Sequence, residues 1–234
     1  MQVPVITVDG PSGSGKGTLC RKLAASLGWS ILDSGALYRL TAIATVDAGL
    51  SLEDEEGAAK LAADLPVEFA QNDKGSEKIL LNGVDVTARV RAEETGGLAS
   101  QVAPHPQVRA NLLVLQKSFR QAPGLIADGR DMGTVIFPDA EIKVFLTASA
   151  QARAQRRVGQ LQDIGQLPSD LDSDSLARLT RGVAGEIAER DERDATRKVS
   201  PLKPAEDALV LDSTELGVEQ VFTRVMELVE QRLA

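Results

Sequence analysis

Short, nearly unbroken apolar runs recur along the chain, and each ends in an acidic residue or a turn. Strands that are apolar without alternation are typical of a sheet covered on both faces, and such sheets are usually parallel with helical crossovers. The pattern therefore predicts an α/β layered fold. The runs are VITVD ending at Asp9, ILD at Asp33, GLIADG around Asp128, IKVFLT at Thr147 and ALVLD at Asp212.

Helical periodicity fills the segments between these runs. Leu19, Leu23 and Leu27 recur at i, i+4 and i+8 in KGTLCRKLAASLG, and Gly28 is placed to end that helix. The alternation of strands and helices supports the α/β prediction. The other predicted helices are 107–121, 149–161 and 214–233, the last with an apolar stripe of Val218, Val221, Phe222, Val225 and Leu228.

Two regions break this rhythm. Residues 64–90 contain PVEFA and KILLNGVDV, and Asn82-Gly83 between β-prone residues predicts a tight hairpin turn. An antiparallel hairpin inserted in a parallel fold indicates a substrate-side subdomain. Residues 159–200 are polar, carry both charge signs and offer few residues for a core, so they are interpreted as a mobile lid.

Composition narrows the class of protein. With 234 residues and 43% hydrophobic content, the chain can bury a full core as one domain with insertions. A formal charge of −8 disfavours general binding to nucleic acid or to an anionic membrane, and it favours a monomer. Any anion that binds therefore needs a local basic site.

The compartment is predicted from three features of the sequence. The start lacks a secretory signal pattern, and no stretch is apolar for the roughly 18 residues that a membrane span needs. The single cysteine, Cys20, lies on a predicted helix, where a core position is favoured over a nucleophilic role. A cytoplasmic location is expected.

A phosphate-binding loop is predicted directly after the first strand. Gly10, four residues and then Gly15-Lys16 give the phosphate-loop spacing, with a strand before it and a helix after it. Glycines let successive N–H groups turn inward, and the lysine reaches the outer phosphates. A glycine-rich turn that binds nothing is the alternative. The predicted ATP-binding residues are Gly10, Pro11, Ser12, Gly13, Ser14, Gly15, Lys16, Gly17 and Thr18.

The loop departs from the usual pattern at one position. Gly17 stands where Ser or Thr is common, and Thr18 follows one place later. Thr18 is therefore a candidate ligand of Mg²⁺, directly or through water, or a ligand of a phosphate only. The sequence lacks the Asn-Lys-x-Asp motif with which a GTPase reads its base, since QNDKGS has the wrong order. A nucleotide switch is accordingly a weaker hypothesis than a kinase.

Histidine is almost absent, whereas arginine is abundant. The one histidine, His105, lies between two prolines and is predicted to be an exposed loop residue. A kinase that phosphorylates a hydroxyl benefits from a base, but a kinase that phosphorylates a phosphate meets an ionised acceptor oxygen. Arginines can then offset the repulsion between two polyanions.

The arginines lie where such a role requires them. Arg39 follows the second strand and Arg130 the third, at the sheet edge where ligands of such folds bind. In EIAERDERDATR a single helical face is predicted to carry Arg190, Arg193, Asp194 and Arg197. A solvated helix with Glu186–Arg190 and Glu189–Arg193 pairs is the competing interpretation.

The stretch LIADGRD places two carboxylates after the third strand. Asp128 could orient magnesium-bound water, and Asp131 could face the acceptor. In the alternative, Asp128 only caps a turn through Asp-Gly-Arg.

Several stretches, taken together, resemble the bacterial cytidylate kinases, a family of phosphate-loop nucleoside-monophosphate kinases. They are ITVDGPSGSGKGTLC, LDSGALYR, LASQVA, GLIADGRDMGTVIFPDA, ERDERD and DALVLDST. The resemblance implies a five-stranded parallel sheet flanked by helices, an antiparallel β-containing acceptor insert and a helical lid. The implied ranges are 1–38, 91–150 and 201–234 for the ATP-binding core, 39–90 for the insert and 151–200 for the lid.

The resemblance also implies roles for individual residues. Lys16, Arg130, Arg190 and Arg197 would be catalytic, and Arg157 would join the ATP site. The lid stretch DIGQLPSDLDSDSLARLTRGVAGEI is longer than usual for the family, which leaves roles for Arg178 and Arg181 open. The residues implied to bind CMP are Ser34, Ser100, Arg109 and Asp131 at the base, Arg39 and Arg130 at the phosphate, and Arg190 and Asp194 at the sugar side.

The expected reaction is direct in-line transfer of a phosphoryl group from MgATP to CMP or dCMP, giving CDP or dCDP. A kinase for another small acceptor, such as UMP, AMP or a metabolite, is the alternative, ahead of a nucleotide switch.

Overall fold

The chain folds into two compact units, Met1–Leu32 with Arg120–Ala234, and Asp33–Phe119. These are called the first and second units below. The computed structural model describes residues 2–71, 77–163, 165–168, 170–197 and 199–233. Residues 1, 72–76, 164, 169, 198 and 234, which fall within the ranges predicted for core, insert and lid, lie outside the described residues.

A five-stranded parallel sheet forms the centre of the first unit, as predicted. Its strand order is β2-β6-β1-β7-β8, so the first strand lies between β6 and β7. In the parallel register Val8 is opposite Asp128 and Asp9 is opposite Gly129, which brings the ends of two predicted runs to one edge. The strands are β1 (Val5–Asp9), β2 (Ser30–Asp33), β6 (Leu125–Gly129), β7 (Ile142–Thr147) and β8 (Leu209–Asp212).

Two amphipathic helices cover the core of this sheet. The α1 helix (Lys16–Leu27) buries Leu19 and Leu23, and Gly28 ends it in the left-handed conformation at φ 68°, as expected. Full burial of a leucine contributes about 2 kcal/mol. The α9 helix (Val218–Leu233) buries Val221 and Val225 in the same cluster.

The prediction of a helix from residue 214 was wrong in its first turn, because α9 begins at Val218. Before it, the N–H of Thr214 donates to the Asp212 carboxylate and the N–H of Gly217 donates to the Gln220 side chain. These local side-chain acceptors satisfy backbone groups that a helix would otherwise pair. Val218 was also wrongly placed on the apolar stripe, since it is 43% exposed.

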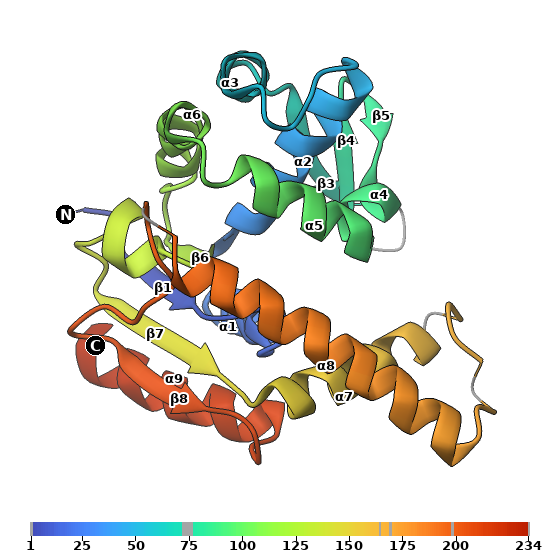
Figure 1. Cartoon of the computed structure of the whole chain (residues 1–234). Coiled ribbons are helices and arrows are strands. Elements are labelled where there is room, and N and C mark those ends of the chain that lie inside the picture. The colour runs from blue at the N-terminus through green and yellow to red at the C-terminus, as the bar shows by residue number, and fades with distance from the viewer. Residues whose placement is uncertain (1, 72–76, 164, 169, 198, 234) are drawn as a thin grey trace. The chain divides into compact units, whose positions relative to one another are not determined.

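The polar segment after β7 folds as two long helices. The α7 helix (Ala150–Asp163) and α8 (Ser173–Ala195) run side by side (Figure 1). Asp172 caps α8 by accepting from the N–H of Ser175 at 2.8 Å. Because α8 ends at Ala195, Arg197 lies beyond the helix on which the sequence pattern placed it.

The second unit combines helices with a small antiparallel sheet of order β3-β4-β5. Asn82 and Gly83 have φ values of 52° and 76° between the paired residues Leu81 and Val84, which confirms the predicted two-residue turn. The elements are α2 (Ser34–Asp47), α3 (Glu55–Ala63), β3 (Val67–Gln71), β4 (Glu77–Leu81), β5 (Val84–Asp85), α4 (Thr87–Arg91), α5 (Glu93–Val102) and α6 (Pro106–Ser118).

His105 is not the exposed loop residue that its flanking prolines predicted. It is half-buried at the start of α6, and its Nε2 lies 2.8 Å from the carbonyl oxygen of Leu52. Proline at the first helical position explains why the helix begins directly after it.

Candidate functional site

The segment Gly10–Thr18, called the phosphate loop here, curls between β1 and α1. Gly10 has φ 148°, and a Cβ there would lie 2.0 Å from the carbonyl oxygen of Leu146 in β7. Gly15, with φ 97°, starts α1 from a left-handed conformation. Glycine alone adopts positive φ values at low cost and has no Cβ to clash with a neighbouring strand. The backbone of the loop therefore requires glycine at these positions.

Lys16 and Ser14 fold back onto the loop itself. The Lys16 ammonium donates to the carbonyl of Pro11 at 2.7 Å, and the Ser14 hydroxyl donates to the same oxygen at 3.1 Å. Lys16 is only 7% exposed. Burial, together with the charge of Arg130, lowers the pKa of Lys16 to about 8. A buried cation at the start of a helix, where backbone N–H groups are unpaired, is a site that favours an anion.

The depressed pKa of Lys16 predicts that ATP binding depends on pH. Since an ATP phosphate attracts only the ammonium form, affinity for a non-hydrolysable ATP analogue should fall about tenfold between about pH 7 and about pH 9. Calorimetric titrations across this range measure the effect. In Lys16→Arg the guanidinium keeps its charge, so the pH dependence should vanish. A flat curve for the unmodified protein would contradict the prediction.

Asp128 and Thr18 lie at the helix end of the phosphate loop. The Asp128 Oδ2 is 3.6 Å from the position that a Cβ on Gly17 would take, and Arg21 donates to the Thr18 hydroxyl at 3.3 Å. Mg²⁺ bound with a nucleotide needs only one or two protein ligands, because phosphates and water supply the others. A carboxylate and a hydroxyl at this position fit that requirement.

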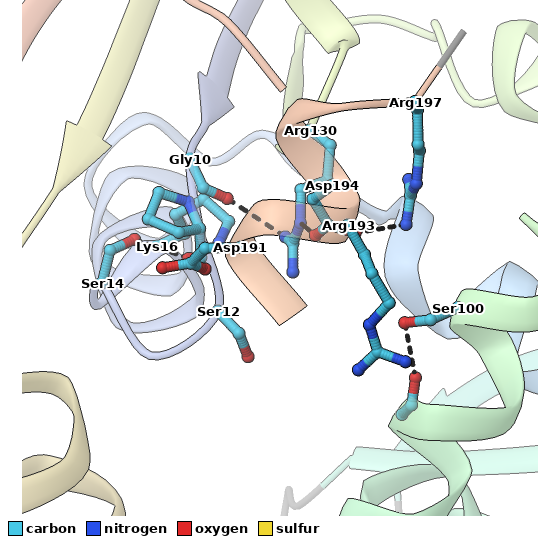
Figure 2. A network of polar contacts seen from close by, with 12 residues as sticks. Gly10, Ser12, Ser14, Lys16, Ser100, Arg130, Asp191, Arg193, Asp194 and Arg197 are labelled. Atoms are coloured by element: carbon cyan, nitrogen blue, oxygen red, sulfur yellow. Dashed lines mark hydrogen bonds and ion pairs between the residues drawn. The ribbon is translucent and has the colours of Figure 1, made fainter. Parts of the chain in front are cut away.

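Arg130 and Arg197, both half-buried, form a charge cluster around the buried Asp194 beside the loop (Figure 2). Arg130 Nε donates to Asp194 Oδ2 at 2.8 Å and its Nη1 donates to the carbonyl of Gly10 at 3.1 Å. Arg197 pairs with the other oxygen of Asp194, which is 1% exposed. Burial alone would raise the pKa of Asp194, but the charges of Arg130 and Arg197 outweigh it and hold that pKa below its ordinary value.

The structure distinguishes the residues of the arginine-rich segment by burial. Asp194 faces inward from α8 and accepts from Arg130, whereas Arg193 is exposed. Arg190 lies half-buried one turn before Asp194, and its charge also acts on the Asp194 carboxylate. Three arginines, Arg130, Arg190 and Arg197, thus surround the Asp194 carboxylate, and Arg130 also reaches the phosphate loop at Gly10.

Asp9 is a buried residue of the site that the sequence reasoning missed. Its two carboxylate oxygens accept from the N–H groups of Met132 and Gly133, both at 2.8 Å. Burial raises the pKa of Asp9 to about 7 against those two donors. The bonds fix the start of η1 (Met132–Ile136), a π-helical turn directly after Arg130 and Asp131. The only sequence feature that indicated a role for Asp9 was its position as the acidic end of the first apolar run.

Asp131 precedes that turn and is 4% exposed. Its carbonyl accepts from the N–H of Val135 at 2.9 Å and from that of Ile136 at 3.2 Å. The turn is therefore fixed at both of its ends, and π-turns of this kind are frequent at functional sites.

The other predicted CMP-binding residues belong to the second unit. Arg39 Nη1 donates to the carbonyls of Val90 and Ala92 at 2.7 and 2.6 Å. Arg109 lies over the ring of Tyr38, with 5.7 Å between the guanidinium carbon and the ring centroid. The remaining two are Ser34, buried at the start of α2, and Ser100 in α5, whose hydroxyl donates to Gly96 at 3.0 Å.

Three arginines of α7 lie within two turns of one another, and the sequence reasoning had singled out only Arg157. Arg156 Nη1 donates to the hydroxyl of Ser213 at 3.1 Å, and that hydroxyl donates to the carbonyl of Ser14 at 3.2 Å. Arg153 is buried against the phosphate loop. These contacts join residues far apart in sequence, so no local pattern could have identified them.

Within the part of the chain that the structure describes, no cluster of three or more His, Cys, Asp or Glu side chains could hold a metal ion by itself. No described helix is both long and apolar enough to cross a membrane.

A parallel sheet whose central strand leads into a phosphate loop, with arginines beside it, is the arrangement of phosphate-loop nucleotide-binding proteins, which include the nucleoside-monophosphate kinases. The family model described as cytidylate kinase matches residues 6–231. The chain belongs to the cytidylate kinase family.

Curated relatives agree along nearly the whole length. The chain is 54% identical to cytidylate kinase of Aeromonas hydrophila over 230 residues, covering 98% of this chain and 95% of that protein. It is 55% identical to that of Stutzerimonas stutzeri, covering 98% and 96%. It is 51% identical to that of Shewanella denitrificans over 234 residues, covering 100% and 99%.

Proposed function

We propose that the chain transfers the γ-phosphoryl group of ATP to CMP or dCMP, giving ADP and CDP or dCDP. The observation that carries this proposal is the phosphate loop with its buried Lys16, flanked by the Arg130–Asp194–Arg197 cluster, in a member of the cytidylate kinase family. The loop supplies a donor site, and the cluster supplies fixed positive charge for the acceptor and the transferred group.

The donor would be held by the phosphate loop. Backbone N–H groups at the start of α1 would bind the outer phosphates. The Lys16 ammonium would bind them too, giving up its hydrogen bond to the Pro11 carbonyl. Arg157 is proposed to contact ATP from α7. Residues 151–200, which contain most of α7 and all of α8, are proposed to cover the donor and exclude water, so that ATP is not hydrolysed.

The acceptor would be read by both charge and hydrogen bonds. Arg39 and Arg130 would hold the CMP phosphate, and Arg190 and Asp194 the sugar side. For residues 39–90 we propose the role of an acceptor insert. The residues proposed to recognise cytosine are Ser34, Ser100, Arg109 and Asp131.

The reaction needs no proton-abstracting side chain. A phosphate oxygen of CMP, already ionised near neutral pH, forms the new bond to the γ-phosphorus, and the bond from that phosphorus to the leaving oxygen of ADP breaks. Lys16, Arg130, Arg190 and Arg197 are proposed to offset the negative charge on the phosphoryl oxygens during transfer.

Mg²⁺ is proposed to accompany ATP. Thr18 and Asp128 would hold it, directly or through water, and the ion would neutralise charge on the β- and γ-phosphates. The protein is proposed to act as a monomer, which its net charge of −8 favours.

A panel of acceptors tests the substrate. With MgATP, the rate of ADP release should show kcat/KM for CMP and dCMP at least about tenfold above that for UMP and AMP, because each mispaired hydrogen bond in a polar base site costs at least this factor. A preference for AMP or UMP would reject the cytosine assignment but leave a kinase. Slow hydrolysis that no acceptor stimulates would favour a nucleotide switch.

A further inference from the structure

Arg153 of α7 joins three separate parts of the first unit. Its side chain is 4% exposed. Nε donates to the carbonyl of Ala148 at 2.9 Å, directly after β7, and Nη1 donates to the carbonyl of Ser12 in the phosphate loop at 3.0 Å. Nη1 also donates to Oδ1 of Asp191 in α8 at 3.1 Å, and Nη2 pairs with the other Asp191 oxygen. One guanidinium thus holds the sheet edge, the loop and the lid helix together.

The contact with the loop is close as well as polar. A Cβ on Gly13 would lie 3.2 Å from the Cβ of Arg153, so the loop backbone packs against this part of α7. The Ser12 carbonyl can point toward α7 because a donor meets it there. Arginine suits this position, since its planar fork satisfies several acceptors at once with little loss of side-chain entropy.

Arg153 contacts α8 at Asp191, in the same helical turn as Arg190 and Asp194, which are proposed to act on the substrates. Asp191 follows Arg190 directly and precedes Asp194 by three residues, so Asp191 and Asp194 lie on one face. Asp194 is attached to the loop through Arg130, which donates to the carbonyl of Gly10. The helix is therefore attached to the loop at two places, Ser12 through Arg153 and Gly10 through Arg130.

Two attachments fix both the rotation and the axial position of α8 relative to the phosphate loop. One attachment would leave the helix free to turn about it. The groups of the Arg130 cluster are proposed to bind substrate, whereas the Arg153 pair engages loop backbone and a carboxylate that the proposed reaction does not use. The Arg153–Asp191 pair thus has a structural contact with the loop, and it is separate from the Arg130–Asp194–Arg197 cluster that is proposed to act on the substrates.

We propose that Arg153, together with Asp191, is a positioning residue for phosphoryl transfer. It acts through the Ser12 carbonyl and through α8, and it sets the alignment between the donor phosphates on the loop and the arginines of the lid helix. This inference rests on the proposed function. A misalignment of about 1 Å costs up to about a hundredfold in rate, so the pair has a large effect without touching a substrate.

Asp191→Asn tests the pair with little change of shape. The amide keeps one acceptor oxygen but loses the charge, so we expect kcat for CMP phosphorylation to fall about 10- to 100-fold. The rate is measured on protein whose folded fraction under assay conditions is determined by circular dichroism. Arg153→Lys should show a similar loss, because lysine keeps the charge but lacks the planar fork.

Combining the two substitutions separates positioning from independent effects. If both act through one pair, the double variant should lose no more than the worse single variant. The matched control is Asp47→Asn, which breaks an exposed pair with Arg89 in the second unit and should leave kcat unchanged.

Three results would overturn the inference. They are a kcat for folded Asp191→Asn within about threefold of the unmodified enzyme, a loss that only follows the unfolded fraction, and losses that multiply in the double variant. If the unmodified chain forms no CDP, the proposed function fails and this inference with it. An active enzyme with an unaffected Asp191→Asn variant overturns the inference alone.

Discussion

Lys16→Ala is expected to lower kcat for CDP formation by about a thousandfold, the scale on which removal of a fixed positive group from a transferring oxyanion acts. The ammonium is the one lysine charge inside the phosphate loop, at 2.7 Å from the Pro11 carbonyl. Alanine leaves the backbone N–H groups in place, so ATP should still bind, but more weakly. Steady-state ADP release with saturating CMP measures the loss.

The same substitution should not unfold the protein. Burial lowers the pKa of Lys16 to about 8, below its ordinary value of 10.5, which means that the charged form is disfavoured in the folded state. Near neutral pH its removal relieves that cost, and the thermal midpoint should stay the same or rise. A midpoint that falls sharply would mean that the rate loss reflects folding.

Lys22→Ala is the matched control, because Lys22 lies on the same helix and pairs with Glu219 at 2.6 Å on the surface. An exposed pair of this kind contributes little, so activity should remain within about twofold. If Lys22→Ala loses as much activity as Lys16→Ala, the loss belongs to the helix and not to the phosphate loop.

The strands, the hairpin turn and the start of α1 could be predicted from short stretches of sequence. The apolar runs, the Asn82-Gly83 turn and the left-handed conformation of Gly15 at the start of α1 each follow from the conformations of a few adjacent residues. Gly10 is also required by a distant residue, because a Cβ there would lie 2.0 Å from the carbonyl oxygen of Leu146. The family resemblance added the number of parallel strands, five. The order β2-β6-β1-β7-β8 was not predicted, because strand order depends on crossovers that no single run encodes.

Contacts across long stretches of chain could not be predicted in the same way. Arg153 reaches Ser12 across 141 residues and Asp191 across 38, and Arg130 reaches Asp194 across 64. An arginine in AQARAQRR resembles any solvated helical arginine until the fold places an acceptor beside it. Arg197 contacts Asp194 from only three residues away, but the burial of that carboxylate depends on Arg130, 64 residues away in sequence.

Asp194→Asn is the second substitution with a large expected effect. Asp194 is the shared carboxylate of Arg130 and Arg197, 1% exposed, and each arginine pairs with a different oxygen. An amide offers only one acceptor, and the two half-buried guanidinium groups would then repel each other without the intervening charge. We expect kcat/KM for CMP to fall about a hundredfold, about 2.7 kcal/mol of transition-state stabilisation, because charged hydrogen bonds are lost.

The loss of the Asp194 carboxylate should also change how the free energy of unfolding depends on pH. The pKa of Asp194 lies below the unfolded value of 3.8, so the ionised carboxylate stabilises the folded state above that value, and this contribution is lost as the pH falls through the folded pKa. The unmodified protein should therefore lose stability more steeply in acid than Asp194→Asn. Denaturant unfolding at neutral and acid pH measures the difference between the two slopes.

Asp174→Asn provides the control, because it makes the same chemical change in the exposed first turn of the same helix. There the carboxylate only favours the positive end of the helix, a contribution of about 0.5 kcal/mol, and CMP turnover should not change. The proposed role of the cluster requires that Asp194→Asn reduce kcat/KM for CMP much more than affinity for ATP. Since Arg130 and Arg197 are proposed to serve the acceptor and the transferred group, equal losses for both nucleotides would instead make Asp194 a support of the fold.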